Sequence, residues 1–364
     1  MKDLVLSRRE LQVLCNCIHS GDKRYIHVSF PFYDLELFTL DIQRPELTKI
    51  VRAKRFEEEL YRRRPADRSV SRDEFPNFTD LRNCLLSSGF LNYANEVEVA
   101  GRLLELKDET RDPNKRPRPL FIAVDTNVLY DKLLSRHLPL KDEATGRLVE
   151  APDFRYVVTE IVQMEIDSNI THKYSREEIG ALGNLLAHRE LLNEFRNGSG
   201  RRARLAKLAL NEMSYLMTQL RALRIKGTPA DNKEENDRRI AESYRNWSRS
   251  GDYEVLLLTA DEDMVHHAIS NELMTLQLQI PYEVPEHGRI DPWAVSDLLY
   301  DLAGTFGAIS LDNEGITLLG EWGGKSSADS TSEHVKAVFE DESKQGRIAQ
   351  QLGICRKILA RYSD

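Results

Sequence analysis

The stretch "PLFIAVDTNVLY", residues 119–130, decides how the middle of the chain folds. Residues 121–124 form an apolar run without polar alternation, which predicts a strand buried on both faces, as in a parallel sheet. Asp125 follows at the carboxyl end of this strand, and the apolar residues after it recur at helical spacing. Because ligands of open α/β sheets bind at the carboxyl ends of the strands, Asp125 is either the N-cap of the next helix or a functional acid.

The composition is that of a globular protein, and 364 residues are enough for two or three domains. With a formal net charge of -8, any affinity for nucleic acid must come from local basic patches and from metal ions. The cysteines show no paired spacing, which argues against a structural zinc site and a disulfide framework. The first residues lack the apolar region of a signal peptide, and no apolar run reaches the roughly 18 residues of a membrane-spanning helix. We therefore expect a cytoplasmic protein that does not enter a membrane.

The first segment, residues 1–116, predicts an α+β domain of its own. Its residues 24–30 and 35–42 alternate like two strands of a hairpin, and residues 45–64 predict a charged helix. Residues 107–118 are charged, contain prolines and lack apolar periodicity, so we place the domain boundary there.

The middle segment, residues 117–304, predicts an α/β domain with a central, mainly parallel sheet, because apolar strands alternate with helices. Further strands are expected at residues 156–158, 255–258 and 273–280. The last segment, residues 305–364, predicts an appendage with a hairpin at residues 307–322 and a helix at residues 333–362.

Residues 171–227 predict a pair of long helices inserted into the middle domain. Ser175 begins the first with a capping box, and the "NGSG" at 197–200 separates the two. The second helix carries an apolar stripe that suits the core or a helix-pair interface, which leaves a homo-oligomer through this insertion open. The stripe consists of Leu205, Leu208, Met213, Leu216, Leu220 and Leu223.

Acidic residues stand where predicted strands end and helices begin. They are Asp125, Glu165, Asp237, Asp261 and Asp263. If successive crossovers of one sheet all deliver carboxylates to one crevice, a cation must balance the charge. Oxygen ligands of this kind suit Mg²⁺ or Mn²⁺. Such an ion lowers the pKa of a bound water and neutralises charge on a phosphodiester.

Four segments resemble the acidic motifs of PIN-domain nucleases, in the family's chain order. They are "FIAVDTNVLY" (121–130), "VVTEIVQMEI" (157–166), "NDRRIAESY" (236–244) and "LLLTADEDM" (256–264). The resemblance covers roughly residues 119–280. It implies a PIN-like three-layer α/β/α fold and a metal-dependent endoribonuclease whose acids hold the divalent metal for hydrolysis of RNA phosphodiester bonds. It implies nothing about the terminal segments.

The second acid of the resemblance could be Glu160 or Glu165. The two are five residues apart, so on a helix they point about 140° apart and cannot both face one crevice. We choose Glu165, since the family places this acid further into a helix that follows a hydroxyl cap such as Thr159.

The third acid is the least determined, because the helical insertion lengthens the chain before Asp237. Its neighbours Asp231, Glu234 and Glu235 are alternatives, and any of them could be a solvated acid favoured by the helix dipole. Three polar residues beside the acids, Thr126, Asn127 and Thr259, are expected to support them rather than to bind metal directly. Thr259 fits the small hydroxyl residue that precedes the family's last acids.

A basic cluster at the start of the second inserted helix is the predicted contact for RNA or another single-stranded nucleic acid. It consists of Arg201, Arg202, Arg204 and Lys207, with no acid until Glu212. Such residues would contact phosphates without reading sequence, although a charge run is often only a solvated face. Two alternatives to an RNA nuclease stay open: a structure-specific DNA nuclease, and a non-catalytic RNA-binding or scaffold protein that retains the fold.

Overall fold

The computed structural model of the protein describes residues 3–19, 21, 23–64, 70–112, 114–142, 145–230, 232–326, 328–329 and 332–362. The chain forms two compact units, which we name after the sheet that each contains. The antiparallel unit consists of Met1–Phe90, Thr171–Leu205 and Glu283–Asp364, and the parallel unit of Leu91–Ile170 and Ala206–Tyr282.

The parallel unit is built on five parallel strands in the spatial order β11-β10-β5-β8-β9. Their bounds are β5 Leu120–Val124, β8 Arg155–Thr159, β9 Leu223–Ile225, β10 Glu254–Thr259 and β11 Met274–Gln277. The chain starts at the centre with β5, extends through β8 to β9 on one side, and returns to β10 and β11 on the other. The boundary between β5 and β10 is therefore the switch point at which α/β sheets bind their ligands. The expected α/β fold with a parallel sheet is confirmed.

Strands β5 and β10 have the composition of central strands. All five residues of β5 are buried, as are Val255 to Thr259 of β10. Ile122 lies opposite Leu256, and the backbone N–H of Asp125 donates to the carbonyl of Leu258 at 3.1 Å. The register thus brings the ends of β5 and β10 to the same level.

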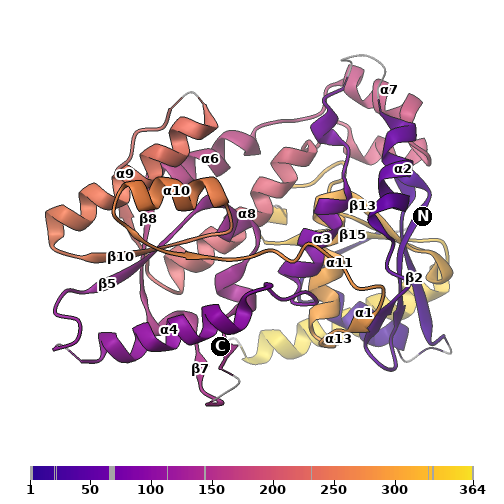
Figure 1. Cartoon of the computed structure of the whole chain (residues 1–364). Helices are drawn as coiled ribbons and strands as arrows, with labels where there is room; N and C mark the ends of the chain where they lie inside the picture. The colour runs from indigo at the N-terminus through magenta and orange to yellow at the C-terminus, as the bar shows by residue number, and fades with distance from the viewer. Residues whose placement is uncertain are drawn as a thin grey trace. The chain divides into compact units, whose positions relative to one another are not determined.

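Helices cover the parallel sheet. They are α4 Glu96–Thr110, α5 Thr126–Tyr130, α6 Glu160–Ile170, α9 Lys233–Gly251 and α10 Glu262–Ser270. All of them except α4, which precedes β5, lie between the strands of this sheet in the chain. Figure 1 shows α9 and α10 above the strands and α4 below them. A small sheet of β6 (Leu140–Lys141) and β7 (Leu148–Val149) lies against α4, and α8 (Arg201–Thr218) contains the boundary between the two units.

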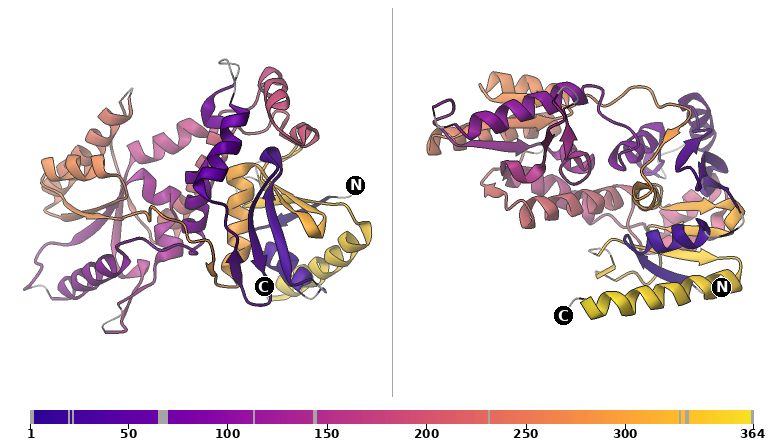
Figure 2. Two further views of the ribbon diagram at one scale, coloured as in Figure 1. Left: turned by 45° about the vertical axis from the view of Figure 1, so that its right-hand side comes forward. Right: turned by 90° about the horizontal axis from the view of Figure 1, so that it is seen from below.

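The antiparallel unit contains an eight-stranded sheet in the order β1-β15-β14-β13-β2-β3-β4-β12. Its strands are β1 Asp3–Ser7, β2 Tyr25–Phe30, β3 Leu35–Asp41, β4 Glu46–Thr48, β12 Gly288–Arg289, β13 Ala308–Leu311, β14 Ile316–Leu319 and β15 His334–Phe339. Its helices are α1 Leu11–His19, α2 Ala53–Arg63, α3 Phe78–Ser87, α7 Arg176–Leu185, α11 Ala294–Phe306 and α13 Glu342–Tyr362. Helices α11 and α13 pack on the sheet, with α1 against both of them (Figure 2). Phe30, Tyr33, Phe56 and Phe306 form an aromatic cluster in its core.

The predicted division into residues 1–116, 117–304 and 305–364 differs from these two units. Strand β1 pairs with β15, and β2 pairs with β13, so both ends of the chain contribute to one sheet. Residues 171–205 of the predicted insertion also belong to the antiparallel unit. Local sequence patterns carry no information about which distant strand a given strand will pair with. Domain boundaries predicted from such patterns therefore divide the chain into consecutive segments, whereas the two units each combine separate segments.

Three strands lie where helices were predicted, and those predictions were wrong. β4 lies within the helix predicted for residues 45–64, of which α2 forms only Ala53–Arg63. β15 occupies residues predicted to be helical, because it is buried on both faces between β1 and β14 and so lacks the alternation of an exposed strand. β9 lies inside the predicted second inserted helix, which ends at Thr218; Leu223 belongs to this strand and not to the helical stripe.

Several local predictions are confirmed. Strands β2 and β3 form the expected hairpin, as do β13 and β14, and the capping box of Ser175 opens α7. Among the described residues, none of the helices has both the length and the apolar composition needed to cross a membrane.

Candidate functional site

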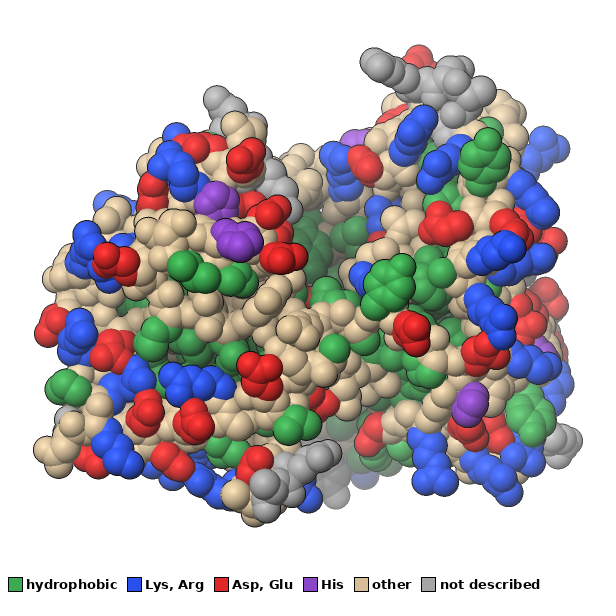
Figure 3. All heavy atoms as spheres, viewed as in Figure 1, with side chains coloured by type: hydrophobic (Ala, Val, Ile, Leu, Met, Phe, Trp, Pro, Cys, Tyr) green, Lys and Arg blue, Asp and Glu red, His purple; other side chains and the backbone are tan. Residues whose placement is uncertain are grey.

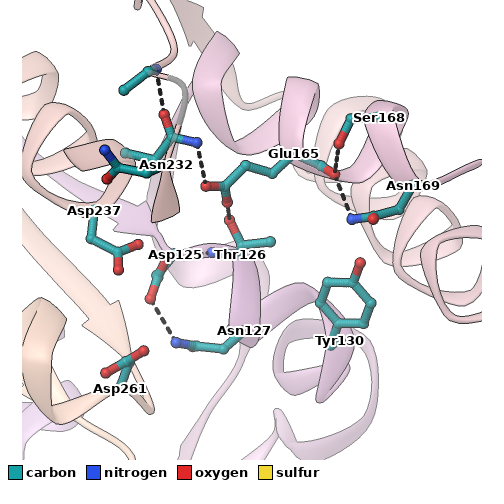
Figure 4. Close-up of a pocket in the computed structure, with 12 residues that line it drawn as sticks. Asp125, Thr126, Asn127, Tyr130, Glu165, Ser168, Asn169, Asn232, Asp237 and Asp261 are labelled. Atoms are coloured by element: carbon teal, nitrogen blue, oxygen red, sulfur yellow. Dashed lines mark hydrogen bonds between the residues drawn. The ribbon is translucent and has the colours of Figure 1, made fainter. Parts of the chain in front are cut away.

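The carboxyl ends of the central parallel strands surround a pocket of about 520 Å³ (Figure 4). It is lined by Asp125, Thr126, Asn127, Tyr130, Glu165, Ser168, Asn169, Ala230, Asn232, Asn236, Asp237 and Asp261. The structure thus brings together four of the five predicted acids. The fifth, Asp263, is exposed and is not among the lining residues.

Asp125 is both the N-cap of α5 and the most buried acid of the pocket. Its carboxylate accepts hydrogen bonds from the backbone N–H of Thr126 at 2.6 Å, from the side-chain amide of Asn127 at 2.6 Å and from the hydroxyl of Thr259 at 2.7 Å. These three residues therefore support the acid, as predicted. The capping and functional interpretations of Asp125 are compatible, since the cap occupies the edge of the pocket.

Burial raises the pKa of Asp125, and so do the negative charges of Asp237 and Glu165; together, against the hydrogen bonds from Thr259 and Thr126, they bring the pKa to about 7. Among the residues that the structure describes, the pocket lining contains neither Lys nor Arg that could counter this charge. A divalent cation in the pocket would supply the missing positive charge and favour the ionised form of Asp125.

Glu165 enters the pocket from α6. Its carboxylate accepts a hydrogen bond from the hydroxyl of Thr126 (Figure 4). It accepts a second one, at 3.1 Å, from the side-chain amide of Asn236. Asn236 is itself held by the backbone N–H of Ala230, which donates to its carbonyl oxygen at 2.6 Å. Glu160 is not among the lining residues, so the geometry favours the choice of Glu165 over Glu160.

Asp237 is buried in the second turn of α9, and a tyrosine two turns later fixes this helix to the sheet. The hydroxyl of Tyr244 donates to the carbonyl of Val124 at 2.7 Å and accepts from the backbone N–H of Thr159 at 3.3 Å. Residues seven apart lie on the same helix face, so the contact of Tyr244 with the ends of β5 and β8 also directs Asp237 toward the pocket. Among the alternatives for the third acid, Glu234 and Glu235 do not line the pocket, and Asp231 lies outside the described residues.

Asp261 is the N-cap of α10 and accepts a hydrogen bond from the backbone N–H of Asp263 at 3.0 Å. The backbone N–H of Asp261 donates to the Thr259 hydroxyl at 3.0 Å. Because this hydroxyl also donates to Asp125, Thr259 links the two acids at the ends of β5 and β10. Asp263 contributes its backbone to the cap, and its side chain is exposed.

The donor set of the pocket is consistent with a hydrated Mg²⁺ or Mn²⁺. In the part of the chain that the structure describes, no three His, Cys, Asp or Glu side chains form a group that could hold a metal ion as they stand. Mg²⁺, however, is usually bound through one or two carboxylates and keeps several of its own waters. Oxygen donors, an uncompensated buried carboxylate and a volume of about 520 Å³ fit such an ion.

The predicted RNA-binding cluster has a different role at two of its positions. Arg201 is buried, and its guanidinium pairs with Asp80 and donates to the carbonyl of Asp73 at 2.6 Å. Arg204 is also buried and donates to the carbonyls of Gly304 at 3.0 Å and Ser199 at 2.9 Å. Buried side chains with these partners stabilise the antiparallel unit and are not exposed to a nucleic acid.

The other two members of the cluster are more accessible. Arg202 is exposed and forms an ion pair with Asp73, and Lys207 is half-buried. Over the face shown in Figure 3, Lys and Arg side chains are interspersed with Asp and Glu. Exposed pairs of this kind, such as Arg102 with Glu105 on α4, balance one another and do not form a basic stripe.

Sequence reasoning missed several residues that shape the pocket. They are Tyr130, Ser168, Asn169, Asn236 and Tyr244. Helical spacing would have found most of them: Ser168 and Asn169 lie three and four residues after Glu165, and Tyr244 lies seven after Asp237.

Comparisons of this chain with protein-family models, with curated proteins and with solved structures give no match.

Proposed function

We propose that this protein is a metal-dependent endoribonuclease with a PIN-like three-layer α/β/α domain, which hydrolyses phosphodiester bonds of RNA. One observation carries the proposal. Four acids from separate segments line one pocket at the switch point of a parallel sheet, and the most buried of them, Asp125, is surrounded by acids rather than by bases. An arrangement that concentrates negative charge in this way is costly to the fold unless a cation binds to it.

The residues have separable tasks in this proposal. Asp125, Asp237 and Asp261 would hold Mg²⁺ or Mn²⁺, with Glu165 beside them. When bound, the ion lowers the pKa of a water and neutralises charge on the phosphodiester. Asn127 and Thr259 fix the orientation of the Asp125 carboxylate through hydrogen bonds of 2.6 and 2.7 Å.

The test is cleavage of a labelled single-stranded RNA by metal-depleted protein to which Mg²⁺ or Mn²⁺ is added back. Asp125→Asn keeps the size and capping ability of the side chain but removes its charge. We expect it to lower the rate by at least about 100-fold. The matched control is Asp167→Asn, which changes an exposed acid of α6 outside the pocket and should keep the wild-type rate. Full activity in Asp125→Asn, with an unchanged melting temperature, would place the site elsewhere.

Two other functions are outcomes of the same assay. A matched DNA strand that is cut faster than the RNA would support a DNA nuclease. Among the described residues, no three His, Cys, Asp or Glu side chains are already placed to hold a metal ion. This observation favours the other alternative, a non-catalytic RNA-binding or scaffold protein. Calorimetric titration with Mn²⁺ separates that case: RNA binding without Mn²⁺ binding and without cleavage would support it.

A further inference from the structure

The pocket has two chemically different halves. The acidic half contains Asp125, Glu165, Asp237 and Asp261, and the neutral half contains Tyr130, Ser168 and Asn169 (Figure 4). The geometry points to the neutral half as a binding site for one nucleobase of the RNA, next to the phosphate that the acidic half would hold through its metal. This inference rests on the proposed function and names the part of the substrate that the site reads.

The volume of the pocket exceeds what a metal ion needs. An ion with a full shell of water occupies roughly 200 Å³, since each water takes about 30 Å³. The pocket measures about 520 Å³, which is within the range of sites for small organic ligands. The remaining space is sufficient for a sugar and a base.

One face of α6 connects the two halves. Glu165, Ser168 and Asn169 lie at spacings of three and four residues, so all three face the pocket (Figure 4). The hydroxyl of Ser168 and the amide of Asn169 each donate to the backbone carbonyl of Glu165 at 2.9 Å. The bond of the Asn169 amide to Glu165 and its contact with the Tyr130 hydroxyl hold the amide in place, so that its carbonyl oxygen can accept a hydrogen bond from a base edge.

Tyr130 supplies an aromatic wall at the end of α5. Its ring is half-buried, and its hydroxyl contacts the Asn169 amide. Single-stranded RNA is commonly recognised by stacking of an unpaired base on such a ring together with hydrogen bonds to the base edge. An uncharged lining with one ring and one fixed amide suits a base and not a second phosphate.

The test combines two variants of the neutral half with matched controls. Tyr130→Ala removes the ring, and Tyr282→Ala removes an exposed tyrosine of the same unit. Asn169→Ala removes the amide, and Asn271→Ala removes an asparagine that makes the same bond to the carbonyl four residues earlier, at 2.9 Å, outside the pocket. Tyr130→Phe keeps the ring and separates stacking from loss of the hydroxyl.

Two readouts are needed. The first is the affinity for short RNA homopolymers of each base, measured in Ca²⁺ to suppress cleavage. We expect Tyr130→Ala to weaken binding by about 10-fold, the usual effect of losing one stacked base, and Tyr130→Phe to bind like wild type. The second is the base preference beside the cut in a random-sequence RNA, which Asn169→Ala should flatten by about 10-fold. A purely structural role of Asn169 would change the rate but not this preference.

The outcomes distinguish the two proposals. If wild type cuts RNA, and both variants bind and choose bases like wild type, the base site is refuted and the nuclease stands. If wild type cuts nothing, yet its RNA affinity still depends on Tyr130 and not on Tyr282, the nuclease is refuted and the base site stands. Equal affinities of wild type and Tyr130→Ala refute the base site in either case.

Discussion

Two buried aspartates, one in each unit, show opposite ways of accommodating a charge. Asp80 in the antiparallel unit closes the capping box of α3 and forms an ion pair with the buried guanidinium of Arg201. Asp125 in the parallel unit also caps a helix, but its charged neighbours are Asp237 and Glu165. The fold supplies an internal counter-charge where an acid is structural. Where the charged neighbours are acids, as at Asp125, the pKa of the carboxyl is raised, and a bound cation would favour its ionised form.

The largest effect is expected from removing Arg201, the cationic partner of the buried Asp80. Arg201→Ala leaves Asp80 buried without its cation, which should lower the free energy of unfolding by about 3–5 kcal/mol. Arg202→Ala removes an exposed pair with Asp73 from the same helix and should cost less than about 1 kcal/mol. Urea denaturation of both variants measures the difference, and equal costs would mean that Arg201 is not the counter-charge of Asp80.

The raised pKa of Asp125 predicts that the stability of the folded protein depends on pH. The pKa of Asp125 is raised from 3.8 to about 7, so between these values the folded state holds a proton that the unfolded state has lost. The contribution of Asp125 to stability is thus fully present below pH 4 and is lost as the pH rises to 7, with a slope of up to about 1.4 kcal/mol per pH unit. Asp125→Asn, which does not titrate, should remove this slope from the stability of the metal-free protein. Denaturant unfolding in EDTA at several pH values measures it, and parallel curves for the two proteins would contradict the raised pKa.

A smaller effect is expected for Tyr244, the tyrosine of α9 that bonds to the ends of β5 and β8. Tyr244→Phe deletes the hydroxyl between Val124 and Thr159 and should cost about 1–3 kcal/mol, because both backbone groups are buried. It should also weaken Mn²⁺ binding by about 10-fold, since Asp237 lies on the same helix. Tyr215→Phe, on a half-buried tyrosine of α8, is the control. Loss of stability with unchanged Mn²⁺ affinity would show that Tyr244 supports the fold alone.

The smallest effect sharpens the choice of the third acid. Glu235 is paired with Arg238 and Arg239 on the solvent side of α9, and these partners lower its pKa to about 2. Glu235→Gln should therefore leave both the urea midpoint of unfolding and the cleavage rate close to those of wild type. Asp237→Asn, two residues on, should abolish cleavage. An inactive Glu235→Gln together with an active Asp237→Asn would reverse the assignment.

The sequence alone predicted the parts of the site that are encoded within a few residues. The apolar run before Asp125 and the one before Asp261 each specify a buried strand, and each acid then caps the helix that follows. Burial of a strand on both faces and capping of a helix are local demands, so they leave a local pattern. The same holds for Thr259, whose hydroxyl serves residues on its own strand end and on the neighbouring one.

Only the tertiary structure decided which of these local pieces meet. Strand order placed β5 beside β10, and joined β1 to β15 from opposite ends of the chain. It also withdrew Arg201 from the predicted RNA surface by pairing it with Asp80, 121 residues away in the chain. Pairings of this length depend on the whole set of competing long-range contacts, and the entropy of closing such loops changes little with their length. No short stretch of sequence therefore records which strand or which counter-charge will be the partner.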